Sequence, residues 1–174
     1  MIGVILAAGE GSRSQDFTWG TPKALLPVGD RTVLRRLSQK LWSLPEMREV
    51  NVVVAARDFA LFQTQRAADS LVAEFPPQGT AGGLLLGLRW QLSRDTVFVA
   101  YGDVVTDLDF RWLADSHQQL CSEPHLTMAT YPVDDPWNRS RTTADANGRV
   151  LAFSEKPLPE NCNLIEYAFS GFFL

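Results

Sequence analysis

The sequence has few cysteines, no long apolar run and no basic N-terminal segment, and each of these shortages excludes a class of protein. Among its 174 residues there are two cysteines, Cys121 and Cys162, which lie far apart and form no CxxC pair. They predict no disulfide framework and fit ordinary thiols in a reducing compartment. Every apolar run falls short of the roughly 20 residues that span a bilayer. The opening "MIGVILAAGEG" lacks the basic start of a signal peptide. We therefore expect no membrane association and a cytoplasmic location.

Basic charge is also scarce. The chain carries 16 Lys and Arg against 20 Asp and Glu, for a formal net charge of −4. Nucleic-acid-binding proteins usually show a basic balance or a basic stripe, so no nucleic-acid partner is expected. The balance still allows a local basic pocket for a phosphorylated small molecule. The remaining composition is typical of a globular protein, and the length predicts a single domain over residues 1–174.

Two common nucleotide-binding signatures are absent. The chain contains neither the GxGxxG dinucleotide fingerprint nor the GxxxxGK[ST] phosphate loop. The first absence disfavours a nicotinamide-dependent oxidoreductase. What stands near the N-terminus instead is "LAAGEGSRSQDFTWGTPKALLPVG", residues 6–29.

Short apolar runs alternate with amphipathic ones, which predicts an α/β layer architecture. Strands are predicted at residues 2–8, 49–56, 96–103, 125–133, 141–150, 151–157 and 167–174, and helices at residues 32–42, 57–71, 80–92 and 109–120. Thr32 is a plausible N-cap, and Asn147-Gly148 is typical of a hairpin turn. The chain stops on apolar residues without a polar tail, so we expect truncation at the C-terminus.

The first predicted strand leads directly into a loop that contains Gly9, Gly11, Ser12 and Arg13, with Lys23 further on. In open α/β sheets, ligands bind beyond the carboxyl ends of the strands. Glycines there let backbone amides approach a phosphate, and the two cations suit phosphate oxygens. The segment therefore predicts a polyphosphate cradle, with a tight turn and solvated charges as the alternative.

Residues 6–28 resemble the signature of the sugar-1-phosphate nucleotidyltransferases, roughly LAAGxGTRLxPLTxxxPKxLLPV, in register and without a gap. Ser12 stands where Thr is usual, and "RSQDFT" departs from "RLxPLT". The resemblance implies a Rossmann-like three-layer sandwich with a mixed, mostly parallel central sheet. The implied nucleotide-binding residues, including two from the motif described next, are Leu6, Ala7, Ala8, Gly9, Gly11, Ser12, Arg13, Lys23, Gly79 and Thr80.

Two further segments resemble the same family. "GTAGGLLLG" at residues 79–87 is similar to its GTAGAL segment, which lies against the base. Glu74 stands five residues earlier, where several relatives carry a base-reading Gln, so the base stays open. "YGDVVTDLDF" at residues 101–110 resembles the GD motif, which implies that Asp103 binds a metal. A carboxylate is also the natural hard ligand for Mg²⁺.

The acceptor end is implied by the C-terminal part of the chain. "FSEKP" at residues 153–157 resembles the EKP motif, which implies that Glu155 contacts the sugar and Lys156 its phosphate. Gly171 occupies the usual glycine place in the strand that follows, which implies that it contacts the sugar phosphate too. Ser140 stands where relatives often have Gly, which implies an altered sugar pocket. The two histidines carry no predicted chemistry.

The implied activity is Mg²⁺-dependent nucleotidyl transfer from an NTP to a sugar-1-phosphate, giving an NDP-sugar and pyrophosphate. Its implied catalytic residues are Arg13, Lys23 and Asp103, with Asp103 the metal ligand, and we expect the three to share one cleft. Family members are often oligomeric, so the resemblance allows a homo-oligomer. Two alternatives stay open: a cytidylyltransferase for a non-sugar phosphate such as phosphocholine, and a non-catalytic nucleotide-binding module.

Overall fold

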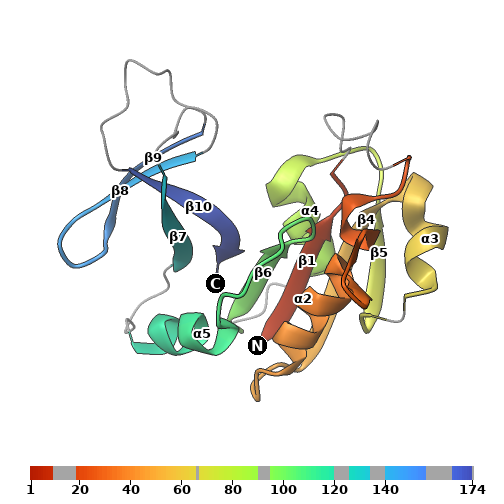
Figure 1. The fold of residues 1–174 in the computed structure, drawn as a ribbon, viewed down its shortest axis with the longest axis horizontal. Helices are drawn as coiled ribbons and strands as arrows, with labels where there is room; N and C mark the ends of the chain where they lie inside the picture. Colours follow the sequence, from red (N-terminus) through yellow and green to blue (C-terminus); the bar gives the residue numbers. More distant parts are fainter. Residues whose placement is uncertain are drawn as a thin grey trace.

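The computed structural model describes residues 1–9, 19–65, 67–89, 95–119, 126–133, 140–155 and 166–173 (Figure 1). The strands are β1 (Ile2–Ala7), β2 (Pro27–Val28), β3 (Arg31–Thr32), β4 (Glu49–Ala55), β5 (Ser70–Glu74), β6 (Val97–Tyr101), β7 (Met128–Val133), β8 (Ser140–Ala144), β9 (Val150–Glu155) and β10 (Glu166–Phe173). The helices are η1 (Lys23–Leu25), α2 (Val33–Trp42), η2 (Ala56–Asp58), α3 (Phe59–Gln63), α4 (Gly79–Gly87) and α5 (Phe110–Gln119).

Within the described residues, the main sheet runs β5-β4-β1-β6-β10-β8-β9, and β7 pairs with β10. The first four strands in that order are parallel to one another. β1 lies between β4 and β6, and Leu6 is in register with Val53 on one side and Tyr101 on the other. Ala55 is likewise in register with Glu74. The carboxyl ends of these four strands therefore meet at one edge of the sheet, where ligands bind in this architecture.

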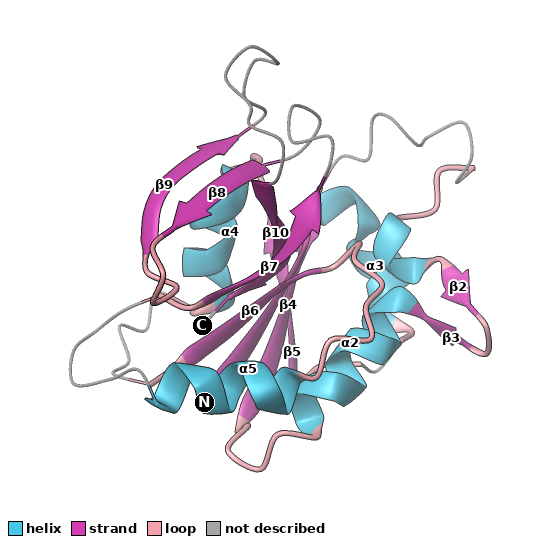
Figure 2. Cartoon of the chain, turned by 60° about the vertical axis from the view of Figure 1, so that its left-hand side comes forward, coloured by secondary structure: helices cyan, strands magenta, loops and turns pink. Residues whose placement is uncertain are grey.

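Helices cover both faces of the parallel strands, so the molecule has three layers (Figure 2). α2, α3 and α5 bury apolar side chains in one core that includes Leu37, Phe62 and Phe110. α4 packs on the opposite face, where Leu84 and Leu88 contact a second core around Val4 and Val53. The predicted α/β sandwich with a mixed, mostly parallel central sheet is confirmed.

The first predicted amphipathic helix forms as expected. α2 buries Val33, Leu34, Leu37 and Leu41, which is the apolar face seen in the sequence. Thr32 caps it, because its Oγ1 accepts a hydrogen bond from the Arg35 amide at 3.2 Å. A capping hydroxyl satisfies one of the amides that a helix N-terminus leaves unpaired.

Removing this cap should weaken the fold measurably. We expect Thr32→Ala to lower the free energy of unfolding by about 1 kcal/mol, the usual cost of losing a Thr cap. Thr32→Ser keeps the accepting oxygen and serves as the control, with a much smaller change expected. Urea denaturation of the three proteins makes the comparison, and equal midpoints would contradict the capping role.

The glycines of α4 allow this helix to lie very close to the sheet. Gly83 and Gly87 are buried on the face that packs against β1 and β4. A Cβ at Gly87 would lie 2.5 Å from Cγ1 of Val4 and 3.0 Å from Cγ2 of Val53. Glycine weakens the isolated helix, but here it allows the helix backbone to approach the strands. The predicted helix covered residues 80–92, whereas α4 spans residues 79–87. Residues 90–92 lie outside the described part of the chain.

The prediction of one helix over residues 57–71 was wrong. Among the described residues of this stretch, helix is limited to η2 and the short α3, and Ser70 already begins β5. The side chain of Asp69 accepts a hydrogen bond from the Val50 amide, and its own amide donates to the Val50 carbonyl. These two bonds tie the segment to β4 and start the parallel pairing of β5. Tertiary pairing therefore overrides local helix propensity at this point.

β10 joins the antiparallel half of the sheet to the parallel half. Its residues Phe172 and Phe173 pair with Ala100 and Val99 of β6. The Phe110 ring lies 4.6 Å from that of Phe98 and 5.1 Å from that of Phe172, measured between ring centroids, so one aromatic cluster links β6, α5 and β10. In the described segments, no helix has the length and apolarity to cross a membrane.

The predicted hairpin is confirmed. β8 and β9 pair antiparallel, and the connecting turn places Gly148 at φ +81°. The Asp145 side chain accepts hydrogen bonds from the amides of Asn147 and Arg149, which closes the turn. An Asn-Gly pair tolerates the positive φ that such a turn requires.

Candidate active site

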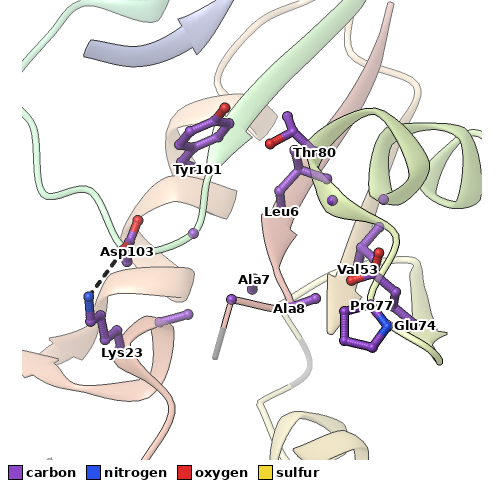
Figure 3. Close-up of a pocket in the computed structure, with 15 residues that line it drawn as sticks. Leu6, Ala7, Ala8, Lys23, Val53, Glu74, Pro77, Thr80, Tyr101 and Asp103 are labelled. Atoms are coloured by element: carbon purple, nitrogen blue, oxygen red, sulfur yellow. Dashed lines mark ion pairs between the residues drawn. The ribbon is translucent and has the colours of Figure 1, made fainter. Parts of the chain in front are cut away.

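A cavity of about 350 Å³ opens at the carboxyl edge of the parallel strands (Figure 3). Residues from the ends of β1, β4, β5 and β6 and from the starts of η1 and α4 line it. They are Leu6, Ala7, Ala8, Gly9, Lys23, Ala24, Val53, Glu74, Pro77, Gly79, Thr80, Gly83, Tyr101, Gly102 and Asp103. The volume is that of a small-molecule site, and the lining is mostly apolar or glycine with a few charged groups.

The charged groups lie at two separate places in the cavity. Lys23 and Asp103 form an ion pair, with Nζ 3.6 Å from Oδ2, and Figure 3 shows them together on one side. Glu74 and Pro77 lie on the other side, with Leu6, Ala7 and Ala8 between the two groups. Both partners of the ion pair are about half exposed. Solvent screens such a pair, so its importance lies in position rather than in stability.

Local structure fixes Lys23 at the cavity. Lys23 follows Pro22 and begins η1, in which the Leu25 amide donates to the Pro22 carbonyl at 2.8 Å. The next residue, Ala24, is buried in the main core. The backbone is therefore anchored on both sides of the lysine, and its ammonium group is held at the cavity beside Asp103.

Asp103 is placed by a close approach of β6 to β1. The Gly102 amide donates to the Leu6 carbonyl at 2.8 Å. A Cβ at Gly102 would lie 2.8 Å from the Cβ of Ala7 and 3.0 Å from the Leu6 carbonyl oxygen. Only glycine fits this gap, and the carboxylate that follows is thereby held beside the end of β1.

Substitution of Gly102 should displace Asp103. We expect Gly102→Ala to lower the free energy of unfolding by about 1–3 kcal/mol, because backbone atoms must separate to admit the methyl group. Gly9→Ala is the stability control, since a Cβ there would have nothing within 4 Å, and we expect a change within about 0.5 kcal/mol. Thermal and urea denaturation test both variants. An unchanged stability in Gly102→Ala would contradict the close approach.

The far side of the cavity is built by β5 and α4. Glu74 ends β5 and is only 7% exposed. Gly79 begins α4 with φ +72°, a conformation that favours glycine, and Thr80 follows it into the cavity. The start of a helix presents unpaired backbone amides. The first two residues of α4 line the cavity, so these amides lie at the cavity.

The described lining carries a net negative charge, which is unfavourable for binding a triphosphate without a metal ion. Its charged residues are Lys23, Glu74 and Asp103, one cation against two anions. The described residues hold no group of three or more His, Cys, Asp or Glu side chains that could form a metal site on their own. Mg²⁺ does not need one, because it binds through one or two carboxylates together with phosphate oxygens and water. Asp103 has the donor chemistry for this role, and its carboxylate is about half exposed at the cavity, so a bound ion can reach it.

The structure brings most of the predicted nucleotide-binding residues together. Seven of the ten line the cavity: Leu6, Ala7, Ala8, Gly9, Lys23, Gly79 and Thr80. Asp103, the predicted metal ligand, lines it as well. Gly11, Ser12, Arg13 and Lys156 lie outside the described residues, as do Cys121 and Cys162, and the side chain of Glu155 is not described either.

Gly171 does not line the cavity. It is buried at φ +88°, and a Cβ there would lie 3.1 Å from Cγ2 of Val104 and 3.4 Å from Cβ of Tyr101. Glycine is therefore required at this position by packing against the segment that carries Asp103. Its expected contact with a sugar phosphate stays a prediction.

Sequence reasoning missed several lining residues. Tyr101 and Gly102 belong to the same short motif as Asp103, and their place directly before Asp103 in the sequence could have suggested them. Gly83 belongs to the segment of residues 79–87 that resembles the family motif, and its place in that segment could have suggested it. Val53 carries no signal of its own, because it enters the cavity through the packing of α4 on β4. Pro77 lies in the β5–α4 connection. The residue pattern predicted a helix over residues 57–71 instead of β5, so it gave no reason to expect a strand end beside Pro77.

A family model for the MobA-like NTP transferase domain matches residues 3–137, which is more than three quarters of the chain. This chain belongs to the MobA-like NTP transferase family. The matched region of the MobA-like domain contains Lys23, Glu74 and Asp103. It ends before Glu155 and Gly171, so the expected acceptor residues have no support from this match.

Individual relatives of the MobA-like domain agree with this assignment. The chain is 29% identical over its full length to a glucose-1-phosphate thymidylyltransferase from Actinoplanes and covers 57% of that protein. It is 28% identical over 88% of its length to a mannose-1-phosphate guanylyltransferase from Mycobacterium tuberculosis and covers 43% of it. The chain thus spans about half the length of these curated relatives.

Solved structures show the same fold. A protein from Bacillus anthracis, assigned as a glucose-1-phosphate thymidylyltransferase and solved with sucrose, superposes with a TM-score of 0.79 at 22% identity. The superposition covers 99% of this chain and 70% of that one. At this level of identity the likeness establishes the fold of the MobA-like domain.

Proposed function

We propose that this MobA-like domain catalyses nucleotidyl transfer from an NTP to a sugar-1-phosphate, with Mg²⁺ as the cation. The observation that carries the proposal is the pairing of Lys23 with Asp103 in a cavity at the carboxyl ends of the parallel strands. The names of the curated relatives favour the same reaction class and sugar phosphates as acceptors. We also propose a cytoplasmic location.

In the proposed reaction, an oxygen of the acceptor phosphate forms a bond to the α-phosphorus of the NTP. The bond from that phosphorus to the oxygen bridging to the β-phosphate breaks, and pyrophosphate leaves with the electron pair. The nucleophile is already an anion, so no general base is needed. Such a transfer depends on positioning and on stabilising negative charge rather than on covalent catalysis by the protein.

The residues of the chain divide this work. Lys23 lies beside the carboxyl edge of β1 and neutralises charge on the α-phosphate and the departing pyrophosphate. Gly9 lies at the end of β1 with open space around its Cα, so its backbone can approach a phosphate closely. Asp103 would hold Mg²⁺, and the ion when bound would supply the positive charge that two approaching anions require.

Four further residues enter the proposal from the sequence resemblance. Arg13 adds a second cation at the phosphates. Glu155 contacts the sugar of the acceptor, and Lys156 holds the attacking phosphate. Gly171 completes this end of the site.

Pyrophosphate release tests the proposal. The protein is incubated with Mg²⁺, each of ATP, GTP, CTP, UTP and dTTP, and a panel of sugar-1-phosphates with phosphocholine added. We expect pyrophosphate only when one NTP and one sugar-1-phosphate are both present. If an NTP releases pyrophosphate with phosphocholine but with none of the sugar-1-phosphates, phosphocholine is the acceptor instead of a sugar phosphate. Nucleotide binding without release for any acceptor would indicate a non-catalytic binding module.

A further inference from the structure

The two charged groups of the proposed chemistry belong to segments that lie far apart in the chain. Lys23 begins the short η1, and Asp103 stands two positions after the end of β6. Their ammonium and carboxylate groups meet in one cavity, where Figure 3 shows the ion pair. A reacting group that is misplaced by about 1 Å can cost roughly a hundredfold in rate. The two segments therefore need a common support.

The helix α2 reaches both segments through two basic side chains. Arg36 and Lys40 are four positions apart in α2, and residues at this spacing lie on the same side of a helix. Both are partly buried, whereas the neighbouring Arg35 and Gln39 are exposed. The side of α2 that carries Arg36 and Lys40 therefore lies against other parts of the chain.

Arg36 binds the β2–β3 hairpin, which is separated from η1 by one residue. Its Nε and Nη2 both donate to the Val28 carbonyl, at 2.8 and 2.5 Å, and Nη2 also donates to Oδ1 of Asp30 at 3.0 Å. Gly29 has φ +67°, and a Cβ there would lie 3.0 Å from Nη2 of Arg36. Glycine at this turn therefore leaves room for the guanidinium, which fixes the hairpin to α2.

Backbone hydrogen bonds extend this anchor to Lys23. The Val33 amide at the start of α2 donates to the Leu26 carbonyl at 3.1 Å, and the Leu26 amide donates to the Lys23 carbonyl at 3.1 Å. Lys23 and Val28 are five positions apart, and these bonds restrain the backbone between them. A displacement of the hairpin would therefore displace Lys23.

Lys40 binds the segment that carries Asp103. Its Nζ donates to the Leu108 carbonyl at 2.9 Å and lies 5.5 Å from the centre of the Phe110 ring. Leu108 is five positions after Asp103. Its amide donates to Oγ1 of Thr106 at 3.0 Å, and its side chain packs against the main core. The segment between β6 and α5 is thus also attached to α2.

We propose that Arg36 and Lys40 are positioning residues that hold Lys23 and Asp103 at their separation in the cavity. The inference rests on the proposed function, because it concerns how these two groups meet the phosphates and Mg²⁺. Neither Arg36 nor Lys40 belongs to the described lining of the cavity, so each acts through another residue. The helix keeps its two anchoring positions about 6 Å apart along its axis, because each residue rises about 1.5 Å.

A first experiment removes each anchor and measures steady-state pyrophosphate release. Arg36→Met and Lys40→Met keep an apolar stem but lose the charge and the N–H donors. We expect kcat to fall about tenfold in each variant and KM for the NTP to stay within about twofold, because the displaced groups act mainly on the transition state. Arg35→Met removes the same charge from an exposed position of α2 and should retain normal kcat.

Double variants separate positioning from a general structural role. If Arg36 acts through Lys23, its loss should cost nothing further once the ammonium is gone. We therefore expect the double variant of Lys23→Ala and Arg36→Met to turn over within about twofold of Lys23→Ala alone. Lys40→Met should likewise have no further effect when combined with Asp103→Ala. An additive loss in either pair would overturn the inference.

Hydrogen exchange of backbone amides provides a measurement that needs no substrate. In Arg36→Met, the amides of Leu25 and Leu26 should exchange at least about threefold faster, since the bonds that close η1 open more often. Amides of β1 are the internal reference for global unfolding, and Arg35→Met is the control. Unchanged exchange at Leu25 and Leu26 would overturn the role of Arg36.

The outcomes distinguish this inference from the function on which it rests. If the unmodified protein releases pyrophosphate and both methionine variants keep a normal kcat, the positioning role is overturned and nucleotidyl transfer stands. If the unmodified protein neither binds a nucleotide nor releases pyrophosphate with any acceptor, the proposed function is refuted, and the positioning role falls with it.

Discussion

Replacing Lys23 with alanine is expected to lower turnover by a little more than a hundredfold and to leave the fold intact. The ammonium group is the cation that the described lining offers to the phosphates. Removing a group that stabilises charge in the transition state commonly costs about 3 kcal/mol of barrier, which corresponds to that factor in rate. The fold should survive because Lys23 is 38% exposed and its ion pair is screened by solvent.

The assay is steady-state pyrophosphate release with the preferred NTP and sugar-1-phosphate. Arg35→Ala removes the same charge from an exposed position of α2 and should retain normal turnover. Lys23→Arg keeps the charge but changes a compact ammonium into a planar fork, so partial activity is expected. Turnover of Lys23→Ala within a few-fold of the unmodified protein would remove Lys23 from the catalytic machinery.

Replacing Asp103 with alanine should have an effect of similar size, but its response to metal should differ. We expect turnover to fall at least a hundredfold, because Mg²⁺ loses its protein ligand. Without divalent metal, Asp103 is an anion beside the triphosphate and opposes its binding. In EDTA, therefore, Asp103→Ala should bind the nucleotide at least as tightly as the unmodified protein does.

Two measurements examine Asp103: turnover over a range of Mg²⁺ concentrations, and nucleotide binding with and without EDTA. Asp115→Ala, which removes an exposed carboxylate from α5, is the matched control. If Asp103→Ala keeps the same Mg²⁺ dependence as the unmodified protein, the metal is held elsewhere. If it binds nucleotide more weakly in EDTA, the carboxylate supports binding by a route other than the metal.

Local patterns were sufficient for most of the elements. The continuous apolar run of β1, the amphipathic face of α2 with its Thr32 cap and the Asn-Gly turn between β8 and β9 each depend on residues close in sequence. β5 failed this kind of reasoning. Its residues Leu71 and Val72 form a strand because β4 offers a parallel partner, in register with Val52 and Val53. No periodicity within residues 57–71 contains that information.

The same division applies to the candidate site. The residue pattern after the first strand drew attention to Gly9 and Lys23, because phosphate chemistry requires glycines and cations there. The family resemblance added Gly79 and Asp103. Glu74 drew attention as a departure from relatives, but its burial and its place opposite Lys23 were visible only in the structure. Gly171 shows the reverse case, since its conformation and packing explain the glycine without any ligand.

The amino-acid sequence by itself determined the layer architecture, the family and the kinds of chemical group at the site, since these follow from short-range patterns and from residue identity. Tertiary structure decided which of those groups share a cavity. Lys23 and Asp103 are 80 positions apart in the chain. They meet because the parallel pairing of β6 with β1 brings Asp103 to the edge of the sheet where η1 holds Lys23. Such pairing depends on contacts between distant strands, and no local run of residues encodes it.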